Sequence, residues 1–298
     1  MRILARLLAC LLALTALASA QGTIGVDPIT RHYTVTPGQT VTQVLNIYNP
    51  NKTALRLKVA VYLMDMNISE VGESEFVPVG SVKESSGPWT TVSPSELDLG
   101  GQETKQVRYT IQVPANAAPG THWAVLMFEG QEPAAVPGKT LASFRLRVGH
   151  TMYVHVQPMT TAGSVTGIFE NVPKTDTGAY ELAVQYTNSG NSAVAVQGRV
   201  ELRDAAGTLV ATLPLDIAVA LPGRSLLLRS AWAGPVPKGQ YTALVILNNG
   251  QKNKDILAEH VVTLPFDLKA AAPASATPTS PPPPPGAGSA GGSGGGRP

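Results

Sequence analysis

The feature that most constrains this chain is a central stretch in which apolar residues occupy every second position. Only His150 interrupts that face, whose other members are Phe144, Leu146, Val148, Met152, Val154 and Val156. Because side chains alternate across a strand, the pattern predicts one β-strand with an apolar and a mixed face. At about 3.3 Å per residue the strand would run roughly 40 Å, about twice the usual length.

We expect so long a strand to leave one β domain and enter another. If its first half lies at the edge of a sheet, it offers unpaired backbone groups and apolar side chains to a strand of another protein. The alternative is that the same apolar face packs into its own sandwich. Alternation alone does not decide between the two.

The first twenty residues predict a secretory signal peptide. Basic residues precede an apolar run over residues 7–17, and Ala18-Ser19-Ala20 matches a signal peptidase site, so we expect cleavage before Gln21. A lipoprotein site at Cys10 is the less favoured alternative, because the apolar run continues beyond it. Cleavage before Gln21 removes the only cysteine, which excludes a disulfide, a thiol nucleophile and a cysteine metal site.

Composition restricts the partners. The 22 Lys and Arg residues include two in the signal, so the mature chain has 22 − 2 = 20 against 20 Asp and Glu, a formal charge of zero. Nucleic acid and anionic membrane surfaces bind through clustered positive charge, so neither is expected as the main partner. No second apolar run reaches the roughly 18 residues of a membrane span. We therefore expect export to the periplasm or cell surface, with no membrane insertion after signal cleavage.

The last thirty residues, 269–298, consist mainly of Ala, Pro, Ser, Thr and Gly, with a five-proline run at 281–285. Such a segment buries too little apolar area to offset the entropy of ordering, so the sequence predicts a disordered tail. Its role is expected to be that of a spacer. A proline-rich ligand is the alternative.

An internal repeat divides the remaining chain. The residues around Asn49 are similar to those around Asn188, and the segment ending at Gly101 is similar to the one ending at Gly223. Pro119-Gly120 corresponds to Lys238-Gly239. Each copy has about seven short strands with regular turn signals. The pattern predicts an all-β chain of two consecutive immunoglobulin-like sandwiches, over residues 21–148 and 149–268.

Catalytic chemistry is not indicated. His150 and His155 fall on opposite faces of a strand, and the other three histidines have no ligand-spaced neighbour. The acidic loop 70–75 could hold calcium through oxygen ligands, but a solvated connection is favoured because it lacks the residues of a known calcium loop. Phosphate-binding, nucleophile-elbow and dinucleotide motifs are missing from the sequence. We expect a protein that is not an enzyme and has no cofactor or metal.

The first domain resembles the amino-terminal domain of periplasmic chaperones of the chaperone-usher pilus pathway. An early strand with Arg31, the segment from Val92-Ser93-Pro94 to Arg108, and the alternating stretch 144–148 followed by Pro158 support the resemblance. It implies two linked immunoglobulin-like domains, the alternating strand completing the fold of a pilus subunit. Phe144, Leu146 and Val148 would then face the subunit.

In the same family, an arginine and a lysine hold the terminal carboxylate of the subunit. The resemblance assigns the arginine to Arg31, whereas the lysine position falls near His150 or Thr151, where this chain has no fixed positive charge. A second, weaker similarity is to secreted Gram-positive proteins that bind WxL-type wall proteins. It is based on Val35 to Thr40, Trp89, Leu99, Val113-Pro114 and Pro119-Gly120.

The leading hypothesis is therefore an exported chaperone-like protein that binds an envelope or pilus-type subunit by β-strand addition along the 144–148 edge. The competing hypothesis is a structural or adhesive module of the cell surface that binds a cell-wall protein, with the tail as its spacer.

Overall fold

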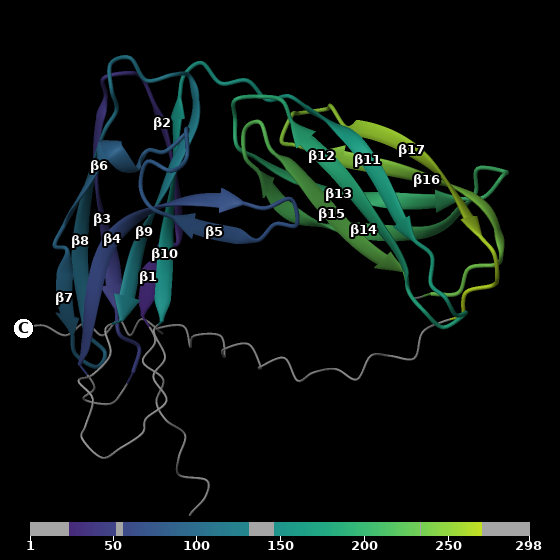
Figure 1. The fold of residues 1–298 in the computed structure, drawn as a ribbon, viewed down its shortest axis with the longest axis horizontal. Coiled ribbons are helices and arrows are strands. Elements are labelled where there is room, and N and C mark those ends of the chain that lie inside the picture. Colours follow the sequence, from purple (N-terminus) through teal and green to yellow (C-terminus); the bar gives the residue numbers. More distant parts are fainter. Residues whose placement is uncertain (1–23, 52–55, 131–145, 233, 270–298) are drawn as a thin grey trace, which may run out of the picture.

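The computed structural model describes residues 24–51, 56–130, 146–232 and 234–269. The described chain is almost entirely β, with one 3₁₀ turn, η2 (Gly87–Trp89), and it forms two sandwich-like units side by side (Figure 1). The prediction of an all-β chain with two sandwiches is confirmed. The predicted signal peptide lies outside the described residues, and so does the predicted tail after residue 269.

Two sheets build the first sandwich. One has the order β1-β3-β8-β6 and the other β2-β10-β9-β4-β5, with β7 paired to β4. Their bounds are β1 (Gly25–Asp27), β2 (Thr30–Val35), β3 (Thr40–Tyr48), β4 (Leu57–Ile68), β5 (Ser74–Val77), β6 (Thr90–Ser93), β7 (Glu96–Leu99), β8 (Thr104–Gln112), β9 (Gly120–Gly130) and β10 (Arg147–Val156).

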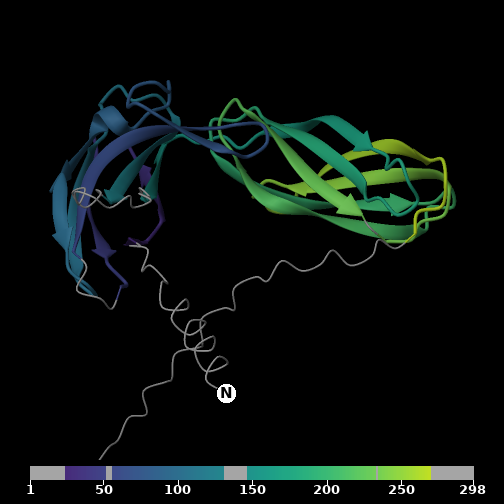
Figure 2. The same cartoon turned by 60° about the horizontal axis from the view of Figure 1, so that its bottom comes forward.

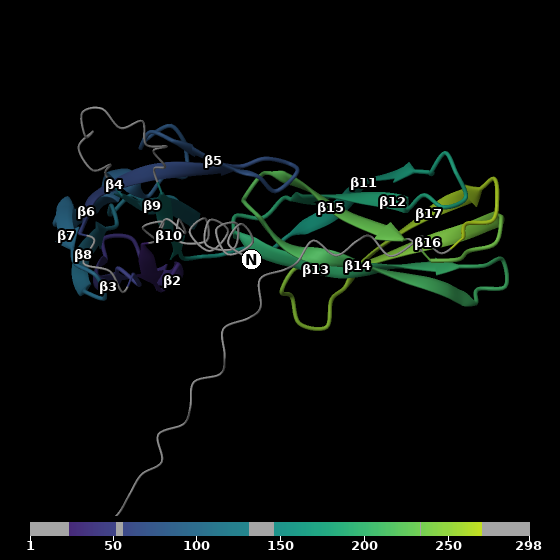
Figure 3. The same cartoon turned by 90° about the horizontal axis from the view of Figure 1, so that it is seen from below.

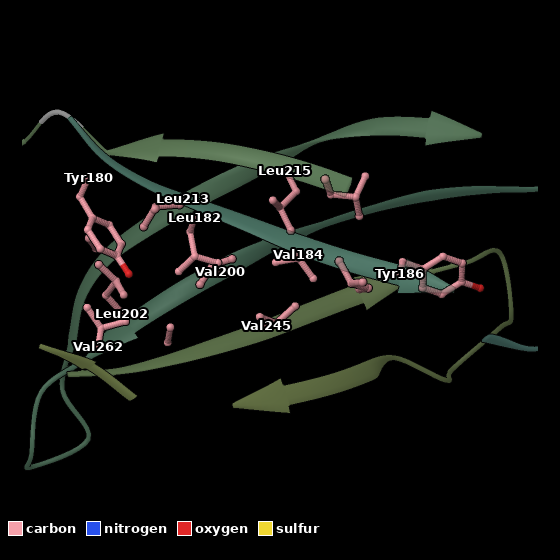
Figure 4. Packing of buried hydrophobic residues seen from close by; sticks show 14 of the residues in the cluster. Tyr180, Leu182, Val184, Tyr186, Val200, Leu202, Leu213, Leu215, Val245 and Val262 are labelled. Atoms are coloured by element: carbon pink, nitrogen blue, oxygen red, sulfur yellow. The ribbon is translucent and has the colours of Figure 1, made fainter. Parts of the chain in front are cut away.

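The second sandwich packs the sheet β11-β12-β15 against the sheet β14-β13-β16-β17. Figure 4 shows alternate side chains of β12, from Tyr180 to Tyr186, pointing toward Val200, Leu213 and Val245 of the opposite sheet. The bounds are β11 (Gly163–Asn171), β12 (Tyr180–Asn188), β13 (Val194–Arg203), β14 (Leu209–Ala220), β15 (Ser225–Trp232), β16 (Gly239–Asn248) and β17 (Ile256–Leu264).

The central strand β10 stays in the first sandwich along its whole length. It pairs antiparallel with β9 from Arg147 to Val156, and Met152, Val154 and Val156 are buried in the first core. The boundary predicted at residue 148 is therefore too early: burying this apolar face keeps the strand in its first sheet up to Val156. Phe144 and Arg145, which the pattern assigned to the same strand, lie outside the described residues.

The internal repeat is visible in the backbone bonding of two turns. The Gln102 amide donates to the Asn49 carbonyl (2.9 Å), and the Gly223 amide donates to the Asn188 carbonyl (3.0 Å). Gln102 and Gly223 both have left-handed backbones, with φ of 59° and 68°. Gly223 thus corresponds to Gln102 and not to Gly101, so the sequence alignment was one residue out at this turn.

A third apolar cluster joins the two sandwiches. It lies on the outer face of the β9 sheet and includes Trp123 and Met127 of the first sandwich together with Leu221 of the second, all nearly fully buried. The even-numbered side chains Ala124, Leu126 and Phe128 are buried in the first core. Strand β9 is therefore buried on both faces, like a strand inside a larger protein.

Hydrogen bonds reinforce this joint. The Thr121 amide donates to the Asn191 carbonyl (2.7 Å), and the Ala193 amide donates to Thr121 Oγ1 (2.8 Å). The β4–β5 hairpin also extends from the first sandwich toward the second (Figures 2 and 3), where the Leu227 amide donates to the Glu70 carbonyl (2.6 Å). These contacts fix the two sandwiches relative to each other at two separate places.

Candidate functional site

The backbone groups of β10 point alternately to its two neighbours. The Gly130 amide donates to the Leu146 carbonyl (3.0 Å), which makes residues 146 and 130 a hydrogen-bonded pair of the antiparallel ladder. On the other side, the Thr151 amide donates to the Ile29 carbonyl (2.8 Å). Even-numbered residues of β10 therefore bond to β9, and odd-numbered residues present their N–H and C=O groups to the opposite side.

That opposite side is occupied only along the second half of β10. Strand β2 pairs in parallel with Thr151 to Val156, and its pairing starts at Thr30. Among the described residues, no strand pairs with β10 beside Arg147 and Gly149. These two residues form what we call the open edge, where the backbone groups of a sheet have no partner strand in the described part of the chain.

The open edge exists because the chain changes sheets just before β2. Strand β1 pairs with β3 in the opposite sheet, up to the pair of Asp27 with Asn46. The chain then crosses through Pro28 and Ile29, whose side chain is 63% exposed, before β2 joins β10. Within residues 24–51, 56–130 and 146–232, the first half of β10 is thereby left at the edge of its sheet.

The side chains predicted to face a partner occupy different environments. Phe144 lies outside the described residues, Leu146 is 37% exposed, and Val148 is half-buried and packs against the first core. Arg31 is half-buried opposite Met152, and its Nη1 donates to Gln43 Oε1 (2.5 Å). Arg31 therefore lies beside the second half of β10, away from the open edge.

An ion pair flanks the open edge on the outer face of the sheet. Arg147 Nε donates to Glu129 Oε2 (2.8 Å), and the Tyr62 hydroxyl donates to the same carboxylate. Burial, followed by the Glu129 carboxylate, raises the pKa of Tyr62. The Arg147 side chain is still 51% exposed, so the guanidinium group can be approached from solvent.

His150 is completely buried next to the open edge, on the face that the sequence pattern assigns to apolar residues. Its Nδ1 donates to the Pro28 carbonyl (2.7 Å), so Nε2 accepts from the Tyr109 hydroxyl (3.1 Å). Tyr109 also bonds to the Tyr33 hydroxyl. Burial lowers the pKa of His150 to about 4, so at neutral pH it adds no positive charge to the edge.

On the opposite face of the sheet, His155 of β10 and His32 of β2 form a pair that the sequence did not reveal. His155 Nε2 lies 3.0 Å from His32 Nδ1, and His155 Nδ1 lies 3.0 Å from Thr121 Oγ1. Burial, and then His32, lowers the pKa of His155. Within the described ranges, no three His, Cys, Asp or Glu side chains gather as metal ligands. No helix there is long and apolar enough to cross a membrane.

No family model matches the sequence, and no curated protein matches it. The solved structures that it resembles include fimbrial chaperones. A chain of the chaperone–tip adhesin complex of CFA/I fimbriae is 11% identical, with coverage of 82% of this chain and 99% of that one at a TM-score of 0.46. The Pseudomonas aeruginosa CupB2 chaperone is 11% identical (80% and 100%, TM-score 0.41), and the E. coli chaperone DraB is 14% identical (80% and 98%, TM-score 0.39).

The chaperone resemblance predicted from the sequence is thus found again among solved structures, which cover about 80% of the chain at low identity.

Proposed function

We propose that this protein is an exported, non-enzymatic binding protein of the chaperone type, which holds an extended segment of another envelope or pilus-type protein against the open edge. The observation that supports it is the one-sided pairing of β10 at Arg147 and Gly149. A strand added there would exchange backbone hydrogen bonds with both residues and continue the sheet. Main-chain pairing of this kind supplies affinity, and side chains select the register.

The groups around the edge give this partner a chemical character. Leu146 is exposed at the start of the edge, next to the half-buried Val148, so apolar side chains of the incoming strand have a surface to cover. On the other face, Arg147 offers an exposed guanidinium to an acidic or amide side chain. The expected partner is an alternating strand with one apolar face and one polar face.

Amide hydrogen exchange tests the open edge without knowledge of the partner. In the free protein, the amides of Arg147 and Gly149 are expected to exchange much faster than those of Val148 and His150, which bond to β9. A fluorescein-labelled nine-residue peptide of alternating valine and threonine should slow exchange at the first two. Equal protection of all four amides in the free protein would refute the open edge.

A proline variant tests strand addition itself. Arg147→Pro removes an N–H that points to the open side and leaves the even-numbered bonds to β9 in place, so it should abolish binding of the valine–threonine peptide in fluorescence anisotropy. Arg147→Ala is the matched control, because it loses the same side chain and ion pair but keeps the N–H. Unchanged peptide binding by a folded Arg147→Pro protein would exclude this edge.

A further inference from the structure

The sheet β14-β13-β16-β17 of the second sandwich contains a β-bulge that leaves an apolar side chain exposed. The register between β13 and β14 shifts between Val196 and Gly198, where one residue of β13 lies opposite two residues of β14, Asp216 and Ile217. Leu215 is buried, and a period of two would bury Ile217 as well. Because of the bulge, Ile217 is instead 66% exposed.

Beside this bulge, Gly198 lets β13 lie close to β16. A Cβ atom at that position would lie 2.1 Å from the Ile246 carbonyl oxygen, so only glycine allows the strands to approach so closely. The surface above it is a groove of about 460 Å³. Its lining includes Gly198, Arg199, Asp216, Ile217, Ile246 and Asp255.

Apolar exposure continues beside the groove. Leu257 pairs directly with Ile246 across β16 and β17, and its side chain is 64% exposed. Ile217 of β14 and Leu257 of β17 are therefore exposed on or beside this groove, and the half-buried Ile246 of β16 lines it. Exposed apolar side chains that gather around a groove mark a binding surface more often than isolated ones do.

Some of the charged side chains that line the groove are paired with an opposite charge, and others are not. Arg199 Nε donates to Glu201 Oε1 (2.8 Å), and Arg203 donates to the other oxygen of the same carboxylate. Asp216 and Asp255 form no ion pair with any residue in the described part of the chain; Asp255 only accepts a hydrogen bond from Asn248 Nδ2 (3.3 Å). The groove thus combines aliphatic side chains with two carboxylates that form no ion pair among the described residues.

We propose that this groove binds an extended peptide segment of another protein in which aliphatic residues alternate with lysine or arginine. The aliphatic side chains would cover Ile217 and Ile246, and the cations would lie near Asp216 and Asp255. This surface belongs to the second sandwich and is separate from the open edge. It would give the protein a second, independent contact with a partner.

The test uses the full mature chain and a capped, fluorescein-labelled heptapeptide of alternating leucine and lysine. The protein should bind it saturably in fluorescence anisotropy, and a leucine–glutamate peptide should not bind. The double variant Asp216→Asn/Asp255→Asn should weaken binding roughly three- to tenfold, as expected for the loss of two exposed ion pairs. Glu259→Gln, the same change outside the groove, should leave binding unchanged.

Two more variants distinguish the groove from the open edge. Ile217→Ser should also weaken the binding, because an aliphatic contact is lost, whereas Arg147→Pro should not alter it. Equal affinity for the lysine and glutamate peptides, or equal affinity of the double variant and the unchanged protein, would overturn the proposal. Loss of binding in Arg147→Pro would assign the peptide to the open edge instead.

Discussion

The cluster between the sandwiches predicts that one side chain supports the stability of both. Leu221 belongs to the second sandwich, is 1% exposed, and packs in the cluster that contains Trp123. Leu221→Ala removes three carbon atoms, which is about 2.4 kcal/mol of transfer free energy at about 0.8 kcal/mol for each carbon. With the cavity that remains, we expect the free energy of unfolding to fall by roughly 3–4 kcal/mol.

The more informative result is which strands are destabilised by Leu221→Ala, not by how much the free energy of unfolding falls. Amide exchange measured by mass spectrometry should rise in β9 of the first sandwich as well as in β16 of the second. Leu213→Ala is the matched control, because Leu213 is equally buried but lies only in the second core, so it should loosen β16 and leave β9 unchanged. If Leu221→Ala also leaves β9 unchanged, the cluster does not couple the sandwiches.

Two further predictions concern buried polar groups of the first sandwich. The pKa of His150 is lowered from 6.5 to about 4 in the folded protein, so the unfolded state binds the proton more readily. The free energy of unfolding should therefore fall by about 3 kcal/mol as the pH drops from about 6.5 to 4. Urea unfolding at several pH values should show that the free energy of unfolding depends less on pH in His150→Gln than in the unchanged protein. An identical pH dependence in the two proteins would show that His150 is not the group responsible. The buried Asp65 carboxylate accepts bonds from the amides of Gly80 (2.8 Å) and Val82 (3.1 Å), so Asp65→Ala should cost roughly 3–5 kcal/mol. A change below about 1 kcal/mol in urea unfolding would show that these amides find other partners.

The sequence carries enough local information to predict an all-β chain, and the predicted seven strands agree with the second sandwich, whereas the first has ten. Period-two alternation predicted β10, and burial of Met152, Val154 and Val156 in the first core agrees with the predicted apolar face. The repeated asparagine turns and the two sandwiches followed from turn signals, because turn geometry depends on a few neighbouring residues. The domain boundary at residue 148 was wrong, since strand length alone does not show in which sheet a strand ends.

The parts that the sequence did not predict depend on contacts between distant segments. The open edge exists because β1 and β2 join different sheets, and His32 meets His155 only through the parallel register of β2 with β10. The bulge at Gly198 likewise depends on which residue of β14 lies opposite. A single sequence predicts which side chains share a face of a strand, but it does not predict which strands pair with each other.

The ten-residue ladder between β10 and β9 has a mechanical consequence for anything held at the open edge. A pull directed along a bound strand would load all the backbone bonds from Arg147 to Val156 at the same time, in shear, and would not open them one after another. Strand β9 would pass that force through Thr121 to the Asn191 carbonyl of the second sandwich. Tension on the cargo would therefore act on the whole two-domain body rather than peel away a single strand.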